Sequence, residues 1–183
     1  NKVYLPILLV ILLMSTNALG QVNRSDIEEK NKWNLKDLFE NDDAWKKKMN
    51  EHLPLADKLL IFKGKLGSSP ETLFNFLEKE YEFNKELYRL FVYASLQSDQ
   101  NTADTKNQAL VQEIGQKAST ISAKLSFISP ELSAISQDKL AKFMKEYPPL
   151  KKYEMFFDNL NRQKKYILSE KEERIIAEAG KLK

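Results

Sequence analysis

The stretch R-L-F-V-Y-A-S-L-Q-S-D-Q-N-T, from Arg89 to Thr102, decides the fold, because a run of large apolar side chains changes abruptly into polar ones. Upstream of this change, residues at steps of three or four form a stripe that is typical of one face of an α-helix. The stripe consists of Leu73, Leu77, Tyr81, Asn84, Leu87 or Tyr88, Phe91, Ala94 and Gln97 or Ser98. It predicts one helix of about 28 residues, or about 42 Å, with Leu87, Phe91 and Ala94 on its packed seam.

The polar run from Gln97 to Thr102 ends this helix, and Asn101 or Thr102 can cap the next one. Asp99 and Asp104 flank the turn and are also interpreted as capping residues. The second stripe consists of Ala109 or Leu110, Ile114, Ala118, Ile121 and Leu125. Two long helices joined by a short polar turn fold back on each other. The sequence therefore predicts an antiparallel helical hairpin over about residues 70–127.

Start and stop signals surround the hairpin on its N-terminal side. Ser68-Ser69-Pro70-Glu71 combines a serine cap, a proline in the first turn and a capping box from Ser68 to Glu71. An earlier helix is expected to begin near Asp42, after the capping cluster Asn41-Asp42-Asp43, and to bend or break at Pro54. It should bury Trp45, Met49, Leu53, Leu59 and Phe62, and end at Gly64 and Gly67.

Shorter helices are predicted after the hairpin. Ser129-Pro130-Glu131 repeats the serine-proline start, residues 136–147 form a helix closed by Pro148-Pro149, and residues 150–164 form the next. Ser169 and Glu172 make a capping box for a final helix through Ile175, Ile176 and Ala179. The chain has only 5 Gly and 6 Pro and offers no convincing strand. The predicted fold class is all-α, a long antiparallel helical hairpin with shorter helices around it.

The N-terminus carries a predicted signal peptide. Lys2 precedes an apolar run from Val3 to Met14, which is too short to span a bilayer, and Ala18 and Gly20 suit cleavage before Gln21. We expect a signal peptide at 1–20, a linker at 21–32, an N-terminal helical region at 33–128 and the truncated start of a following helical lobe at 129–183. The expected location is therefore exported, periplasmic or extracytoplasmic. An uncleaved membrane anchor is the alternative.

Charge and residue types exclude several function classes. With 29 basic and 26 acidic residues the net charge is +3, and the signs alternate along the chain, so we expect no nucleic-acid partner. There is no Cys, which excludes disulfides, thiolate metal sites and cysteine nucleophiles. A zinc hydrolase needs two histidines on one helix, and a serine triad needs at least one beside its nucleophile.

His52 is the sole histidine of the chain. Because it precedes a proline on a Lys- and Glu-rich helix, it is expected to be an exposed surface residue. Glycine-rich phosphate-binding motifs are absent from the sequence, and the acidic clusters fit capping positions. The sequence thus predicts no catalytic, cofactor-binding or metal-ligating residue in this chain, and no bound zinc.

Five phrases in order nevertheless resemble one family. They are W-N-L-K-D-L-F (33–39), F-K-G-K-L (62–66), L-Y-R-L-F-V-Y-A-S-L-Q-S-D-Q-N-T-A-D (87–104), L-S-F-I-S-P-E-L (125–132) and Y-E-M-F-F-D-N-L-N-R-Q-K-K-Y-I-L-S-E-K-E-E-R-I-I-A-E (153–178). Together they resemble the N-terminal part of oligoendopeptidase F, a zinc metallopeptidase of the thimet-oligopeptidase-like family. Tyr166 departs from the family's pattern, which often has His before the hydrophobic-Leu-Ser phrase.

The resemblance implies a mostly helical peptidase with a deep cleft that admits short peptides. In that family an H-E-x-x-H helix and a downstream Glu bind zinc, which activates water. That motif is absent from this sequence, so the resemblance places the catalytic site beyond residue 183 and implies that the fragment alone is inactive.

Three hypotheses remain open at this point. The first is the N-terminal part of an exported zinc oligoendopeptidase, with peptide substrates and no stable membrane insertion after signal cleavage. The alternative is an exported non-enzymatic helical binding protein that uses the hairpin as its partner surface. In the third, the leader stays in place as a signal anchor. The sequence does not indicate which oligomeric state the protein adopts.

Overall fold

The structure is a computed structural model and describes residues 26–180. The predicted signal peptide and residues 21–25 of the predicted linker lie outside the described residues. Every regular element between residues 26 and 180 is an α- or 3₁₀-helix, so the all-α prediction is confirmed. None of these helices combines the length and the apolar character that a membrane crossing needs.

The chain divides into two compact units, Asn1–Asn34 and Leu35–Lys183. The described part of the first contains a 3₁₀ turn, η2 (Glu29–Asn31), next to an ion pair of 2.6 Å between Lys32 Nζ and Glu29 Oε1. The second contains the remaining described elements. The expected boundary near residue 128 between two helical regions stays a prediction.

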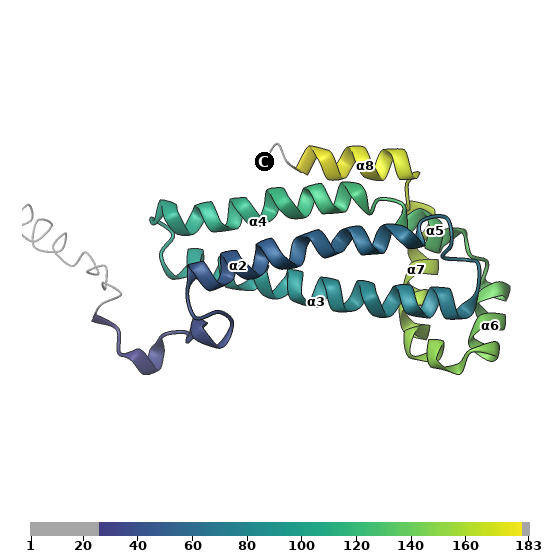
Figure 1. Cartoon of the computed structure of the whole chain (residues 1–183), viewed down its shortest axis with the longest axis horizontal. Coiled ribbons are helices and arrows are strands. Elements are labelled where there is room, and N and C mark those ends of the chain that lie inside the picture. Colours follow the sequence, from purple (N-terminus) through teal and green to yellow (C-terminus); the bar gives the residue numbers. More distant parts are fainter. Residues whose placement is uncertain (1–25, 181–183) are drawn as a thin grey trace, which may run out of the picture. The chain divides into compact units, whose positions relative to one another are not determined.

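The predicted hairpin is present as α3 (Pro70–Gln100) and α4 (Thr105–Lys124), which run antiparallel and side by side (Figure 1). Ser69 caps α3, because its hydroxyl accepts a hydrogen bond of 3.1 Å from the Thr72 N–H. The predicted capping box from Ser68 to Glu71 is therefore wrong by one residue. Pro70 takes the first helical position, where its missing N–H costs nothing.

The turn of the hairpin is shorter than the polar run suggests. Helix α3 continues to Gln100, and the Asp104 carboxylate caps α4 by accepting a hydrogen bond of 2.9 Å from the Lys106 N–H. Capping of α4 by Asn101 or Thr102 was thus a wrong expectation. The Asn107 side chain donates a 3.0 Å hydrogen bond to the Gln97 carbonyl oxygen, so α4 itself satisfies a backbone group in the last turn of α3.

A third rod packs against the hairpin. It consists of α2 (Asp42–His52), capped by Asn41, and η4 (Leu53–Phe62), which follows without a break. The helix changes from α to 3₁₀ geometry at Leu53-Pro54, which agrees with the predicted bend at Pro54. Proline causes the change because it has no N–H to donate to the preceding turn. Gly64 ends the rod with a φ of +75°, a conformation that favours glycine.

The unit Leu35–Lys183, which we call the main unit, has its core between the α2–η4 rod and the hairpin. The Trp45 indole N–H donates a 2.9 Å hydrogen bond to the Leu90 carbonyl oxygen, and the Trp45 ring stacks on Tyr93. The fully buried side chains of α3 include Leu73, Phe76, Leu90 and Ala94. Their spacing is closer to 3.5 than to 3.6 residues per turn, as expected for a helix that follows a neighbouring helix.

This spacing corrects the predicted stripe on α3. Leu73, Leu77 and Ala94 are buried as expected, and Leu87 and Phe91 are half-buried. Tyr81, however, is 57% exposed, and Asn84 is also exposed. The predicted stripe left the buried face because it advanced by steps of four from Leu73 to Tyr81. The buried face instead continues through Phe83 and Leu90.

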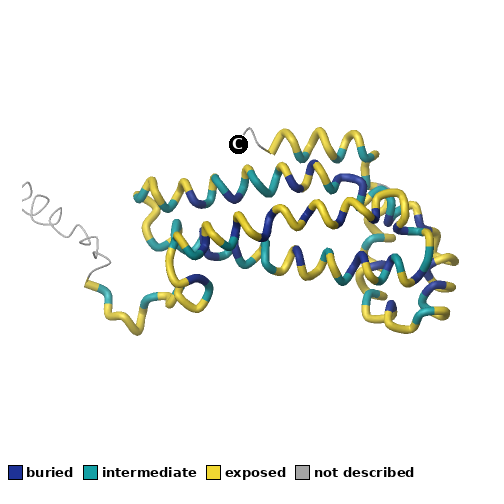
Figure 2. Tube along the Cα trace, viewed as in Figure 1, coloured by how far each residue is buried: buried dark blue, intermediate teal, exposed yellow. Residues whose placement is uncertain are grey.

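The remaining helices follow the hairpin. They are α5 (Ile128–Ala134), α6 (Gln137–Glu146), η5 (Pro148–Tyr153), α7 (Glu154–Gln163), η6 (Lys164–Tyr166) and α8 (Glu170–Ala179). Ser136 caps α6, and Ser169 and Glu172 form the predicted capping box of α8. Helix α5 begins at Ile128, so the expected start at Ser129 is wrong. Figure 1 shows α8 lying along α4, and the burial colours of Figure 2 show it largely exposed.

Candidate functional site

His52 is buried, which corrects the expectation that it lies on the surface. It is 8% exposed, its ring stacks on Phe83 with centroids 4.8 Å apart, and its Nε2 lies 2.9 Å from the Phe83 carbonyl oxygen. Because a carbonyl oxygen only accepts hydrogen bonds, Nε2 carries the proton and donates it. Trp45, Met49 and His52 share one helical face, but Phe83, which covers His52, is brought near it only by folding.

The described residues contain no metal centre that His52 could join. Between residues 26 and 180, no group of three or more His, Asp or Glu side chains is arranged so that it could hold a metal ion. His52 instead connects α2 to α3 through its hydrogen bond and its ring contact. The expectation that this chain contributes no catalytic, cofactor-binding or metal-binding residue stays a prediction.

A polar network ties the start of α2 to both helices of the hairpin. The Tyr93 hydroxyl donates a 2.9 Å hydrogen bond to Asp42 Oδ1, and Lys106 Nζ lies 2.8 Å from Asp42 Oδ2. Gln97 Nε2 donates a 2.9 Å hydrogen bond to the Tyr93 oxygen. Burial alone would raise the pKa of the Asp42 carboxyl, but the hydrogen bonds from Lys106 and Tyr93 together lower it below its usual value.

A second cluster ties the other end of α3 to η5. The Tyr153 hydroxyl donates to Glu78 Oε1, and Lys152 Nζ pairs with the same oxygen. The hydrogen bonds from Lys152 and Tyr153 lower the pKa of Glu78. Burial and the bond to Glu78 raise the pKa of Tyr153, so this phenol keeps its proton at neutral pH and serves as a donor. Both clusters hold helices together.

An open groove of about 860 Å³ lies between α3, α4 and α8. We call it the hairpin groove. Its lining residues are Phe91, Ser98, Gln108, Val111, Gln112, Gly115, Gln116, Ala118, Ser119, Ser122, Ile176, Ala177 and Gly180. None of these lining residues is charged, although 30% of the chain is. The groove combines apolar contact area with amide and hydroxyl groups that can both donate and accept hydrogen bonds.

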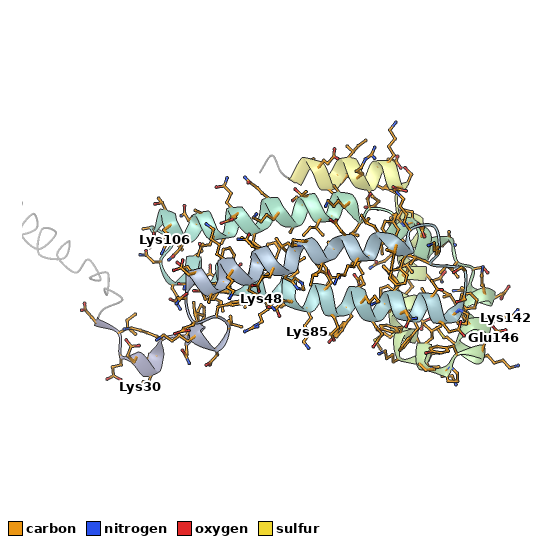
Figure 3. All side chains as sticks on the ribbon, viewed as in Figure 1. Lys30, Lys48, Lys85, Lys106, Lys142 and Glu146 are labelled. Carbon is orange, nitrogen blue, oxygen red and sulfur yellow. The ribbon has the colours of Figure 1, made fainter. Side chains whose placement is uncertain are left out.

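Another face of α3 presents aromatic side chains to solvent. Tyr81 is 57% exposed and Tyr88 is 72% exposed, and their separation of two helical turns puts them on one side of the helix. Lys85 lies between them and points away from the helices in Figure 3. The predicted packed stripe included Tyr81, and Tyr88 as an alternative to Leu87, so this exposed surface was not predicted.

Comparison with known proteins shows what the chain is similar to. A family model described as Oligopeptidase F matches residues 131–182. The chain is 32% identical over 160 residues to "Oligopeptidase PepF" of Bacillus subtilis, covering 87% of this chain and 24% of that protein. It is 35% identical over 164 residues to "Group B oligopeptidase PepB" of Streptococcus agalactiae, covering 87% of this chain and 27% of that protein.

A solved structure of an oligoendopeptidase F is also similar to this chain. The crystal structure of oligoendopeptidase-F from Enterococcus faecium matches with a TM-score of 0.67 and 27% sequence identity, over 78% of this chain and 28% of that chain. The resemblance to the N-terminal part of oligoendopeptidase F is therefore confirmed. The chain spans about a quarter of the length of the curated relatives it matches.

Proposed function

We propose that this chain, as a homologue of the N-terminal part of oligoendopeptidase F, belongs to a longer zinc-dependent peptidase that hydrolyses peptide bonds in short peptides. The observation that supports this most directly is similarity over 87% of the chain to proteins named as oligopeptidases. Since residues 26–180 contain no group of side chains fit to hold zinc, the metal ligands would come from a motif beyond residue 183. No step of the hydrolysis is assigned to a residue of this chain.

The role proposed for this chain is a wall of the peptide cleft. Three rods, α2–η4, α3 and α4, are tied by a buried tryptophan, a buried histidine and the Asp42 network, which makes a rigid support. The exposed face of α3 with Tyr81 and Tyr88 is the surface we expect peptides to touch. Tyrosine suits varied peptides, because its ring contacts apolar side chains while its hydroxyl bonds to backbone groups.

The test is peptide hydrolysis by the longer protein that contains this chain. An internally quenched peptide of about ten residues should be cleaved, the activity should disappear with a chelator, and stoichiometric zinc should restore it. The 183-residue chain should be inactive in the same assay. A reading frame that continues without an H-E-x-x-H motif, or a longer protein that binds peptides without cleaving them, would instead favour the non-enzymatic helical binding protein.

We also propose that the protein is exported, with a signal peptide at 1–20. The support is the basic residue followed by a short apolar run and small residues before Gln21. The measurement is N-terminal sequencing of the protein recovered from cell fractions, which should begin at Gln21 in an extracytoplasmic fraction. A protein that keeps residues 1–20 and sediments with membranes would support the uncleaved anchor.

A further inference from the structure

A second open cavity lies where the α2–η4 rod meets α3, and we call it the His52 pocket. Its volume is about 310 Å³, which is at the lower end of the range of small-molecule sites in proteins. Two segments that are far apart in the sequence build it, because η4 and α3 pack against each other. Its lining residues are His52, Leu55, Lys58, Leu59, Glu78, Lys79, Glu82 and Phe83.

The walls of the His52 pocket are apolar and aromatic. Leu59 and Phe83 are buried, whereas Leu55 is 39% exposed and stands at the mouth. The ring of His52 stacks on Phe83, so the two rings together form one wall. A ligand with an aromatic ring gains contact area here, because rings pack well against leucine side chains and against other rings.

His52 provides one hydrogen-bond acceptor in this apolar setting. Because its Nε2 donates to the Phe83 carbonyl oxygen, Nδ1 of the same neutral ring carries a lone pair and accepts. Within residues 26–180 Nδ1 has no partner, and Gln100 Nε2 is the sole partnerless side-chain nitrogen or oxygen that is shut off from solvent. Nδ1 is therefore accessible although His52 is buried, and the pocket is the open space that His52 lines.

The charges at the mouth of the pocket favour a neutral donor. The Glu78 carboxylate is already paired with Lys152. Lys58, Lys79 and Glu82 make no ion pair within residues 26–180, so the remaining charge at the mouth is positive. An ammonium or guanidinium group would be repelled there, and a carboxylate has no proton to donate to Nδ1. A phenol hydroxyl or an indole N–H meets both conditions.

The pocket opens beside the exposed tyrosine face of α3. Glu82 follows Tyr81 directly and lies about 100° around the helix from it, and Glu78 lies about 60° from it. At the outer radius of a helix, 100° corresponds to about 10 Å, which about three extended residues span. A peptide that touches Tyr81 can therefore place a neighbouring side chain in the pocket.

We propose that the His52 pocket binds a tyrosine or tryptophan side chain of a short peptide, whose phenol O–H or indole N–H donates a hydrogen bond to His52 Nδ1. This rests on the proposed function, in which short peptides are the substrates. His52 is then a specificity residue and takes no part in hydrolysis. Phenylalanine fits the same apolar walls but leaves Nδ1 without a donor, so the pocket should prefer tyrosine to phenylalanine.

Blocked pentapeptides with alanine on both sides of one central residue test this preference. The central residue is tyrosine in one peptide and phenylalanine in its control, and p-cresol represents a free phenol. Binding to the 183-residue chain is followed by ¹H–¹⁵N chemical-shift titration, and binding to the longer protein by calorimetry after treatment with a chelator. We expect a Kd of about 1 mM for the tyrosine peptide and a value about three- to tenfold higher for the phenylalanine peptide.

Three variants locate the binding site, each checked for a cooperative unfolding transition. Leu55→Trp fills the mouth from an exposed position and should weaken binding of the tyrosine peptide at least fivefold. Ile61→Trp adds the same ring at another exposed position of η4, outside the pocket lining, and should leave the Kd unchanged. His52→Phe keeps a ring against Phe83 but removes Nδ1, so both peptides should bind it equally. If His52→Phe does not fold, the other two variants still decide.

Other results would overturn the proposal. Equal Kd values of the two peptides for the wild-type chain would mean that Nδ1 receives no donor. An unchanged Kd in Leu55→Trp would put the peptide elsewhere, and binding of p-cresol without binding of the tyrosine peptide would restrict the pocket to free phenols. If Leu55→Trp had no effect in the longer protein, another part of that protein would cover the pocket.

These titrations need no hydrolysis. A longer protein that binds the tyrosine peptide in the His52 pocket but cleaves no peptide would contradict the proposed function and leave this inference intact. A longer protein that cleaves peptides but shows no preference for tyrosine in this pocket would do the reverse.

Discussion

Trp45 connects two helices through both ends of its side chain. Its ring is fully buried and stacks on Tyr93, while its N–H reaches the Leu90 carbonyl oxygen at 2.9 Å. Replacing Trp45 by Phe removes the donor and leaves a void beside Tyr93. We expect the free energy of unfolding to fall by about 1–3 kcal/mol, measured by urea denaturation.

Trp33 provides a matched control for this substitution. It is 58% exposed, so Trp33→Phe should change the free energy of unfolding by less than about 0.5 kcal/mol. Equal effects of the two substitutions would show that the Trp45 contact does not stabilise the fold.

Asp42 makes stability depend on pH. Its folded-state pKa is lowered from the usual 3.8, so its contribution is present above that value and is lost as the pH falls through the lowered one. Asp42→Asn should destabilise the protein by about 1 kcal/mol at pH 7. The difference between wild type and variant should shrink below pH 3.8, in urea titrations at several pH values.

The adjacent Asp43→Asn substitution controls for the lost charge at the start of α2. Asp43 is exposed and occupies the same helix start, but the hydrogen bonds from Tyr93 and Lys106 go to Asp42. If both variants lost the same stability with the same pH dependence, the helix dipole and not the network would be responsible.

At the scale of the element, helix α4 contains a glycine that its helical geometry does not require. Glycine inside a helix costs about 0.5–1 kcal/mol relative to alanine, and a Cβ at Gly115 meets no described atom within 4 Å. Gly115→Ala should therefore raise the free energy of unfolding of the 183-residue chain by about 0.5–1 kcal/mol. Thermal denaturation followed by circular dichroism measures this.

Gly64 is the contrasting position, because its φ of +75° is unfavourable for any residue with a Cβ. Gly64→Ala should lower the free energy of unfolding by about 1 kcal/mol, although space around it is also open. Stabilisation by both substitutions would mean that Gly64 does not hold this conformation in solution.

The N-terminal caps of the helices show which helix starts can be predicted from neighbouring residues alone. The capping box at Ser169 was predicted correctly, because both of its hydrogen bonds join residues only three positions apart. The cap of α3 was placed at Ser68 instead of Ser69. For α4 the capping role of Asp104 was predicted correctly, but Asn101 and Thr102 were wrong candidates for the same cap. Neighbouring serine, threonine and asparagine side chains are equally good acceptors, so the packing of the hairpin chooses among them.

At the scale of the whole molecule, the proposed contact of Tyr81 and Tyr88 with peptide substrates can be tested by substitution. In the longer protein, replacing Tyr81 and Tyr88 together by Ala should lower kcat/KM for short peptides about 5- to 10-fold, with little effect on stability. Ile61 is 61% exposed on η4, so Ile61→Ala serves as the control and should leave kcat/KM unchanged. An unchanged kcat/KM in the double variant would remove this face of α3 from the proposed cleft.

The family resemblance was correct, and it came from ordered phrases in the sequence and not from a catalytic motif. Similar proteins named as oligopeptidases match most of this chain, which accounts for about a quarter of their length. In the proposed peptidase, the role of this chain is to provide support and surface. Its functional features are therefore faces of helices, which short sequence motifs describe poorly.

The sequence by itself determined the helical class, the hairpin, the bend at Pro54 and the start of α8. These depend on hydrogen bonds and side-chain spacings within four or five residues along the chain. Only the tertiary structure decided that His52 is buried, that Tyr81 is exposed and that α4 forms ion pairs with α2–η4 while its other face lines an open groove. The reason is physical: burial and ion pairing depend on residues brought near by folding, such as Phe83 for His52 and Asp42 for Lys106.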